Sequence, residues 1–212
     1  FQSVLALKMR HIPNKMFYQA KGLITAIMPE IVGVMKGGFQ ESGLQNCYFP
    51  KLVRIGHGAF DNCKMEQLNP EIFSTLQFVG KQGFANCPLS SVNLPSLLSI
   101  DNRGFYNCKS FKKFSAENLQ SIGKECFSNC PVLSSICCNL EPKQFVCGDQ
   151  NKGFCECPIC TGQLLMCMRI GNTTRKLERA QQVQLSLLTS MCQLCGHKQS
   201  GQERIFGEEQ ER

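Results

Sequence analysis

Cysteine is the most reactive residue type in this chain, and its spacing near the C-terminus could build a metal site. The 212 residues include 15 cysteines, and two C-x-x-C pairs, Cys157–Cys160 and Cys192–Cys195, have 31 residues between them. Two such pairs can hold Zn²⁺ in a tetrahedral thiolate site, each binding the ion from a tight turn. The separation exceeds the common spacing of roughly 15–20 residues. Further candidate ligands are Cys155, Cys167 and His197.

The same region has a second interpretation as a disulfide cluster. Seven cysteines fall between Cys137 and Cys167. An exported protein would join such cysteines as disulfides, whereas a reducing compartment would leave thiols that can bind zinc. Unstructured free thiols are the third alternative. Zinc is therefore the one cofactor that the sequence suggests, and it competes with disulfides at Cys157, Cys160, Cys192 and Cys195.

Catalytic chemistry has few candidate groups. The histidines are His11, His57 and His197, and the three aspartates are far apart in the sequence. A cysteine nucleophile needs a base held beside it, and only Cys195 has a histidine close in sequence. No glycine-rich phosphate-binding loop is present. The sequence predicts a protein without enzymatic activity.

Four other cysteines belong to a motif, Phe-x-Asn-Cys, that recurs along the first two thirds of the chain. Its phenylalanines follow one another at intervals of 24, 21 and 22 residues, and the same interval reaches back to two more phenylalanines. An apolar residue stands five positions before each phenylalanine and another stands eight before. Three extra residues near Asn69–Phe73 account for the interval of 24. The six phenylalanines are Phe17, Phe39, Phe60, Phe84, Phe105 and Phe127.

A fixed period of about 20–29 residues with regularly placed apolar positions indicates a solenoid. One unit cannot bury enough apolar surface to fold alone, so neighbouring coils must stabilise one another. We expect about seven coils of α/β or mainly β type, with short strands stacked in a parallel sheet. A proline ends the strand, a second extended piece follows, and a helical or 3₁₀ turn places each phenylalanine in a common column.

The asparagine and cysteine of the motif have structural explanations. Asparagine side chains can satisfy backbone groups at turns, which is the role we expect for Asn62, Asn86, Asn107 and Asn129. Cysteines at equivalent positions in stacked coils point the same way, with Cβ atoms too far apart for a disulfide. We therefore expect a column of buried free thiols at Cys63, Cys87, Cys108 and Cys130.

Residues 1 to about 136 resemble the BspA-like leucine-rich repeat family. The resemblance rests on the pattern I-G-x-x-A-F-x-x-C, which is nearly complete from Ile55 to Cys63 and less complete from Ile122 to Cys130. Membership would imply a curved right-handed solenoid, often part of a surface or secreted protein that adheres to host matrix proteins or cells, without enzymatic activity.

If the strand assignment is right, the residues that flank the central inward side chain point outward onto a concave sheet face. This face is small and polar, with an apolar corner at Leu5, Ile27 and Tyr48. Such a surface suits recognition of a protein or peptide; a solvated sheet face is the alternative. The candidate ligand-binding residues are Asn46, Tyr48, Gln67, Asn69, Ser91, Asn93 and Lys113.

Charge and hydropathy restrict the class of partner. The net charge is +7, and most of it lies in residues 1–140, spread over loops without a continuous run, so we expect no nucleic-acid ligand. No apolar run approaches the ~18 residues of a membrane span. The chain opens in phase with the repeat at Phe1, without a methionine or leader, so we expect a fragment or processed chain.

The sequence divides into residues 1–140, a leucine-rich repeat solenoid; residues 141–171, a small cysteine-rich segment; and residues 172–212, a short helix with the second C-x-x-C pair and a disordered polar tail. The predicted function is a non-enzymatic protein-interaction module of adhesion type, extracellular or at the cell surface, with a host or matrix protein as ligand. The alternative is a cytoplasmic scaffold or adaptor with a C-terminal zinc-binding module.

Overall fold

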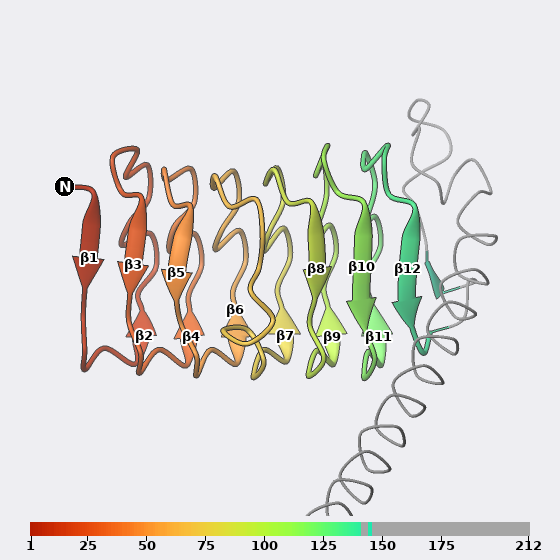
Figure 1. The fold of residues 1–212 in the computed structure, drawn as a ribbon, viewed down its shortest axis with the longest axis horizontal. Helices are drawn as coiled ribbons and strands as arrows, with labels where there is room; N and C mark the ends of the chain where they lie inside the picture. The colour runs from red at the N-terminus through yellow and green to blue at the C-terminus, as the bar shows by residue number, and fades with distance from the viewer. Residues whose placement is uncertain (141–143, 146–212) are drawn as a thin grey trace, which may run out of the picture. The chain divides into compact units, whose positions relative to one another are not determined.

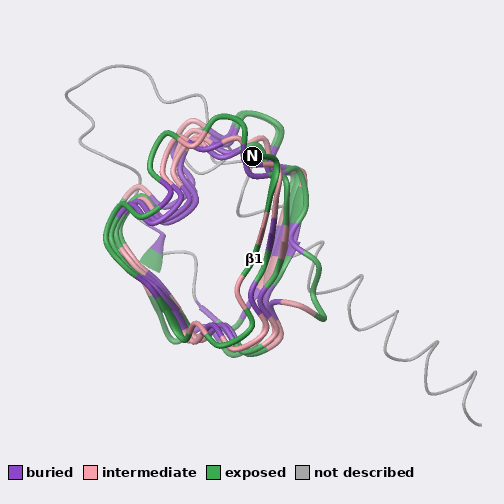
Figure 2. Ribbon diagram, turned by 90° about the vertical axis from the view of Figure 1, so that its left-hand side faces the viewer, coloured by how far each residue is buried: buried purple, intermediate pink, exposed green. Residues whose placement is uncertain are grey.

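The computed structural model describes residues 1–140 and 144–145. Over residues 1–140 the chain winds into successive coils of short strands and tight turns (Figure 1). Looking along the stack, buried and exposed segments recur at the same places in successive coils (Figure 2). The prediction of a mainly β solenoid with parallel strands is confirmed. The cysteine-rich segment and the C-terminal helix predicted for residues 141–171 and 172–212 lie outside the described residues, apart from Gln144 and Phe145.

The first side of each coil carries the longer strand of the repeat. Its central residue points inward and is apolar, and its flanking residues point outward, as expected for a strand with one buried face. Neighbouring strands pair in parallel with matched register, for example Val4 with Ala26 and Phe114 with Ile136. The strands of this side are β1 (Ser3–Leu5), β3 (Thr25–Ile27), β5 (Asn46–Tyr48), β8 (Ser91–Asn93), β10 (Lys113–Ala116) and β12 (Ser135–Cys138).

The second side carries a two-residue strand whose second residue is the apolar position five before the repeat phenylalanine. These strands form one continuous parallel sheet in the order β11-β9-β7-β6-β4-β2. It contains one strand from each of six coils, and β12 opens a seventh coil. The strands are β2 (His11–Ile12), β4 (Gly33–Val34), β6 (Arg54–Ile55), β7 (Phe78–Val79), β9 (Ser99–Ile100) and β11 (Ser121–Ile122).

The third side is a ribbon of tight turns that contains the phenylalanine motif. In the first coil the N–H groups of Lys15, Phe17 and Gln19 donate to the second coil at 3.0, 2.8 and 2.9 Å, while the N–H groups between them close turns within their own coil. This alternation requires a left-handed backbone two residues before and two residues after each phenylalanine, with φ between 55° and 62°. The left-handed residues are Lys15, Gln19, Gly37, Glu41, Gly58, Asn62, Gln82, Asn86, Arg103, Asn107, Glu125 and Asn129.

The expectation of a helical or 3₁₀ turn at this place is therefore wrong in detail. A helix uses every N–H group within its own segment, whereas here every second N–H donates to the neighbouring coil. The turn ribbon thus contributes to stacking in the same way as the two sheets do.

The first side is interrupted at the fourth coil, which carries the three extra residues. The strands of this side form two separate sheets, β1-β3-β5 and β8-β10-β12, and between them Gln67 makes only an isolated bridge with Ser91. The N–H groups of Gln45 and Asn46 both donate to Ile24 O at 3.0 Å. Within the described part of the chain, the fourth coil makes no equivalent bonds to the third. The parallel sheet predicted for the longer strands is therefore divided in two, and the continuous sheet is formed by the second extended pieces.

The phenylalanine column runs through the interior of all six coils. Neighbouring rings of Phe17, Phe39, Phe60, Phe84, Phe105 and Phe127 stack with centroid separations of 5.0, 5.4, 5.3, 5.4 and 5.9 Å. The interplanar angles are 9–15°. Phe145 continues the column, 6.2 Å from Phe127. The predicted common core of phenylalanines is confirmed.

Candidate ligand-binding face

We call the outward side chains of the first-side strands the strand face. Because the strands pair in register, the face has two columns with one residue per coil in each. The first column contains Ser3, Thr25, Asn46, Gln67, Ser91, Lys113 and Ser135, and the second contains Leu5, Ile27, Tyr48, Asn69, Asn93, Ser115 and Cys137. All seven residues predicted to bind a ligand lie on this face and are exposed.

The apolar end of the strand face is a row of three side chains. Leu5 pairs with Ile27 and Ile27 with Tyr48 in the parallel register of β1, β3 and β5. Their exposed fractions are 64%, 41% and 47%. The other residues of these three strands are either polar or at least partly buried. Three large apolar side chains directly adjacent on an exposed sheet face form a patch of the kind that marks interaction sites.

The polar end of the strand face is separated from the apolar row by the break at the fourth coil. Asn46 and Tyr48 belong to the β1-β3-β5 sheet, whereas Ser91, Asn93 and Lys113 belong to the β8-β10-β12 sheet. The predicted residues therefore share one side of the solenoid but are divided between two sheets. Asn69 lies at the break, and its Oδ1 accepts the N–H of Glu71 in the same loop at 2.9 Å. This oxygen is therefore less available to a ligand.

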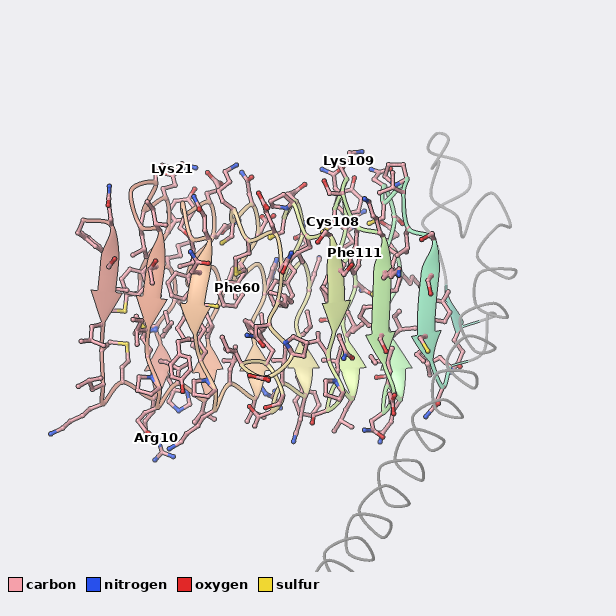
Figure 3. The ribbon with its side chains drawn as sticks, viewed as in Figure 1. Arg10, Lys21, Phe60, Cys108, Lys109 and Phe111 are labelled. Atoms are coloured by element: carbon pink, nitrogen blue, oxygen red, sulfur yellow. The ribbon has the colours of Figure 1, made fainter. Side chains whose placement is uncertain are left out.

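A hollow of about 350 Å³ opens at the start of β1, β3 and β5. Gln2, Ile24 and Gln45, each directly before one of these strands, contribute to its wall. The remaining lining residues are Phe1, Lys21, Gly22, Ser42, Gly43 and Lys64. In Figure 3, Lys21 and Lys109 project from one edge of the solenoid, while Arg10 projects from the opposite edge. The hollow thus lies at the opposite end of these three strands from the apolar row, with two lysines in its wall. The repeat pattern does not predict it, because residues from different coils come together there only through stacking.

The hollow depends on close backbone approach at Gly43. A Cβ atom at this position would lie 2.1 Å from the carbonyl oxygen of Lys21, far inside van der Waals contact. Glycine therefore allows the second and third coils to meet here, and the absence of its side chain helps to leave the space open.

A side-chain ladder on the turn ribbon was also missed. Asp61 accepts hydrogen bonds from Gln40 Nε2 at 3.1 Å and from Asn86 Nδ2 at 2.7 Å, and Asn86 Oδ1 accepts from Asn107 Nδ2 at 2.6 Å. The expectation that the motif asparagines bond to backbone groups is therefore corrected for Asn86 and Asn107, because each donates to a side chain of the preceding coil. Asn129 Nδ2 likewise donates to the hydroxyl of Tyr106 at 3.0 Å. Their role is structural, joining coils and tolerating the left-handed turn.

The repeat cysteines form the predicted column of buried free thiols. Each donates to a carbonyl oxygen of the preceding coil, at 3.1 Å for Cys63 to Phe39, 3.0 Å for Cys87, 3.3 Å for Cys108 and 3.2 Å for Cys130. Burial raises the pKa of Cys63 to about 12, and it raises the pKa of Cys87 as well. Thiols held protonated in this way are poor nucleophiles.

The described residues contain neither a metal centre nor a membrane-spanning helix. Over residues 1–140 and 144–145, no three His, Cys, Asp or Glu side chains come together in a group suited to a metal ion. The candidate zinc ligands Cys157, Cys160, Cys192 and Cys195 lie outside this range, so their role stays a prediction. The described part of the chain contains no helix long and apolar enough to cross a bilayer.

Comparison with known proteins agrees with the observed architecture. The model of the BspA type leucine rich repeat region matches residues 3–66 and 33–157, in six copies. Among solved structures, a leucine rich repeat protein of T. pallidum is 20% identical, with 62% of this chain and 77% of that chain covered and a TM-score of 0.47.

Two further solved structures are similar at lower levels. A leucine rich cell surface protein of Faecalibacterium prausnitzii is 16% identical over 68% of this chain and 61% of that chain, with a TM-score of 0.29. A leucine-rich repeat protein of Bacteroides ovatus is 15% identical over 74% and 62%, with a TM-score of 0.33. No curated protein matches the sequence. The repeat motif, the stacked coils and the matching family model together show that the chain belongs to the BspA-type leucine-rich repeat family.

Proposed function

We propose that this chain is a non-enzymatic protein-interaction module that binds a protein or peptide ligand at the apolar end of the strand face. The observation that carries the proposal is the in-register row of Leu5, Ile27 and Tyr48, exposed by 64%, 41% and 47% on three adjacent strands. Burying such a row would stabilise a complex by ~25 cal/mol per Å² of apolar surface, less the cost of association.

The surroundings of the row favour an extended ligand with an acidic group. Asn46 beside Tyr48 offers an amide for hydrogen bonds to a ligand backbone, and the tyrosine supplies a rigid aromatic anchor. The hollow at the start of the same strands would accept a side chain, with Lys64 at its wall to pair with a carboxylate. Lys21, on the same wall, already lies 3.9 Å from the carboxylate of Glu41. Gln67, Asn69, Ser91, Asn93 and Lys113 would extend the contact across the break.

The expected setting follows from the family. A surface or extracellular location, with a host or matrix protein as ligand, is the proposal that fits an adhesion-type repeat protein. The cysteines beyond Leu140 bear on this point, because disulfides there would indicate export and bound zinc with reduced thiols would indicate a reducing compartment. Alkylation of the native chain without reductant, followed by mass measurement, distinguishes these states.

The binding proposal is tested by substituting two of the three residues of the apolar row, both at exposed positions. Ile27→Ser and Tyr48→Ser, singly and together, are compared with Val132→Ser, which removes a valine that is 45% exposed outside the row. The probes are a panel of purified extracellular-matrix proteins and peptides selected from a random library on the unmodified chain. We expect the double variant to weaken binding by at least about tenfold, as for loss of an interface anchor.

The matched control is expected to bind within about twofold of the unmodified chain, since an isolated rim residue contributes little. Equal binding by the unmodified chain and the double variant, with both folded by circular dichroism, would move the site away from this row.

A further inference from the structure

The corner between the second-side sheet and the turn ribbon carries one outward residue per coil in a straight column. The backbone fixes this alignment, because the carbonyls of successive members accept an N–H from the preceding coil at 3.0, 2.9, 2.8, 3.1 and 2.9 Å. We call this set the corner column. Its members, from the first to the sixth coil, are Asn14, Lys36, His57, Lys81, Asn102 and Lys124.

The corner column lies within the most basic part of the solenoid. Each column member lies in a six-residue segment of its coil, and these segments are residues 10–15, 32–37, 53–58, 77–82, 98–103 and 120–125. Together the six segments contain seven Lys or Arg residues and two acidic residues, a net charge of +5. All of residues 1–140 contain fourteen Lys or Arg residues and eight acidic residues, a net charge of +6. The net positive charge is therefore concentrated at this corner although half of the basic residues lie elsewhere, because a period of about 22 residues brings separated lysines together.

The three lysines of the column are available to a ligand. Lys36, Lys81 and Lys124 are exposed, and within the described residues none of them has a carboxylate at ion-pair distance. The carboxylate of Glu125 is occupied by Arg103, at 2.5 Å. Asp101 is the second acidic residue of the corner, and its Oδ1 accepts the N–H of Asn102 at 2.6 Å.

Along the column, a lysine alternates with a neutral hydrogen-bonding side chain. Amide or imidazole groups occupy the first, third and fifth coils, and lysines occupy the second, fourth and sixth. Adjacent coils are spaced by ~4.8 Å, which is close to the length of one sugar ring in an extended β-linked chain. A polymer laid along the column would thus meet one coil per sugar.

We propose that the corner column binds a linear acidic polysaccharide in which a sugar bearing a carboxylate or sulfate alternates with a neutral sugar. Each lysine pairs with a charged sugar, and Asn14, His57 and Asn102 lie beside the neutral sugars. Asn102 Oδ1 already accepts the N–H of Lys124 at 2.8 Å, so its amide N–H groups would meet the sugar. His57 Nε2 shares a hydrogen bond of 3.3 Å with Gln82 Oε1, so its other ring nitrogen would do so. Charge complementarity supplies attraction and the alternation supplies register. This inference does not depend on the proposed function, which concerns the strand face.

Other polyanions fit the corner less well. Single-stranded nucleic acids need exposed aromatic rings for base stacking, but the one Phe, Tyr or Trp of these six segments, Phe78, is half-buried with the guanidinium of Arg54 4.6 Å from its ring centroid. An added peptide strand needs free backbone groups, whereas the column's carbonyls already accept hydrogen bonds. A membrane surface calls for apolar side chains to insert, and Met35 is the single large exposed apolar residue in these segments.

The test measures binding of the full chain to immobilised hyaluronan oligomers, in which uronate and neutral sugar alternate, at several salt concentrations. The column variant is Lys36→Gln with Lys81→Gln and Lys124→Gln. The control variant, Lys8→Gln with Lys109→Gln and Lys112→Gln, removes the same charge from exposed lysines outside the corner segments and the hollow. We expect the column variant to bind more than about tenfold more weakly, with a smaller salt dependence, and the control to stay within about threefold.

A second comparison tests the alternation itself. Asn14→Ala with His57→Ala should weaken binding to hyaluronan but leave binding to polygalacturonate, which is charged on every sugar, unchanged. The proposal is overturned if hyaluronan does not bind at low salt, if both triple variants lose affinity equally, or if oligo(dT) or anionic vesicles bind more tightly than hyaluronan. Thermal unfolding followed by circular dichroism verifies that each variant is folded.

Discussion

The benzyl group of Phe105 contacts four other phenylalanines and is fully buried. Its ring centroid lies 5.4 Å from Phe84, 5.5 Å from Phe111, 5.6 Å from Phe114 and 5.9 Å from Phe127. Truncation here leaves a cavity that the rigid stack cannot close. We expect Phe105→Ala to lower the free energy of unfolding by ~3–5 kcal/mol, measured by urea titration.

The control for this substitution is Phe78→Ala. Phe78 is half-buried on the outward face of β7, where it contacts Arg54 rather than the phenylalanine column. Its loss should remove a cation–π contact of ~0.5–1 kcal/mol without opening the core. A similar urea midpoint for Phe105→Ala and the unmodified chain would remove Phe105 from the stabilising core.

The buried thiols predict a loss of stability at alkaline pH. Burial raises the pKa of Cys63 and of Cys126 from 9.0 to about 12. Between these values the unfolded chain has lost the thiol proton and the folded chain retains it, so the unfolded state gains stability as pH rises. Each thiol should therefore lower the free energy of unfolding by ~1.4 kcal/mol per pH unit between roughly pH 9 and 12.

Denaturant titrations of the unmodified chain and of Cys63→Ala with Cys126→Ala across this range measure the effect. Other groups titrate there too, so the quantity of interest is the difference between the two slopes, expected to be ~2.7 kcal/mol per pH unit. Identical slopes would show that these thiols ionise freely in the folded chain.

At the scale of elements, the sequence period predicted the strands, the inward residues and the phenylalanine column. These features depend on residues that recur within every coil, so each copy repeats the signal. Asp61 and Gln40, and the hollow beside Gly43, could not be predicted in this way, because they depend on which side chains meet between particular coils. The turn ribbon was not predicted because only two of its twelve left-handed positions are glycine, whereas six are Lys, Gln, Glu or Arg.

The break in the first side predicts uneven protection of backbone amides. The N–H groups of Ser134 and Ser135 donate to Lys112 O at 2.9 and 3.2 Å, whereas in the described portion of the chain Glu66 and Gln67 make no equivalent bond. Losing such a bond costs ~1 kcal/mol. We expect the Glu66 and Gln67 amides to exchange with deuterium about fivefold faster, allowing for intrinsic rates. Equal protection would mean that the first-side sheet is continuous in solution.

At the scale of the whole solenoid, stacking places residues that recur once per repeat side by side, and each repeat position forms its own surface. The apolar row lies on the first side, and the corner column lies between the second-side sheet and the turn ribbon. A protein ligand and an acidic polysaccharide would therefore contact different residues. Scattered lysines in the sequence become a single line only because each coil adds one residue to it.

The ring of Phe145 extends the stack although it comes 18 residues after Phe127, outside the period of the repeat. It therefore covers Phe127 at the next place in the aromatic column without the spacing of the motif. A chain shortened to residue 140 would lack Phe145 and would expose the ring of Phe127 at the end of the column. We expect this truncated protein to self-associate through the exposed ring, as oligomers detected by sedimentation. A protein expressed for study should therefore extend beyond residue 145.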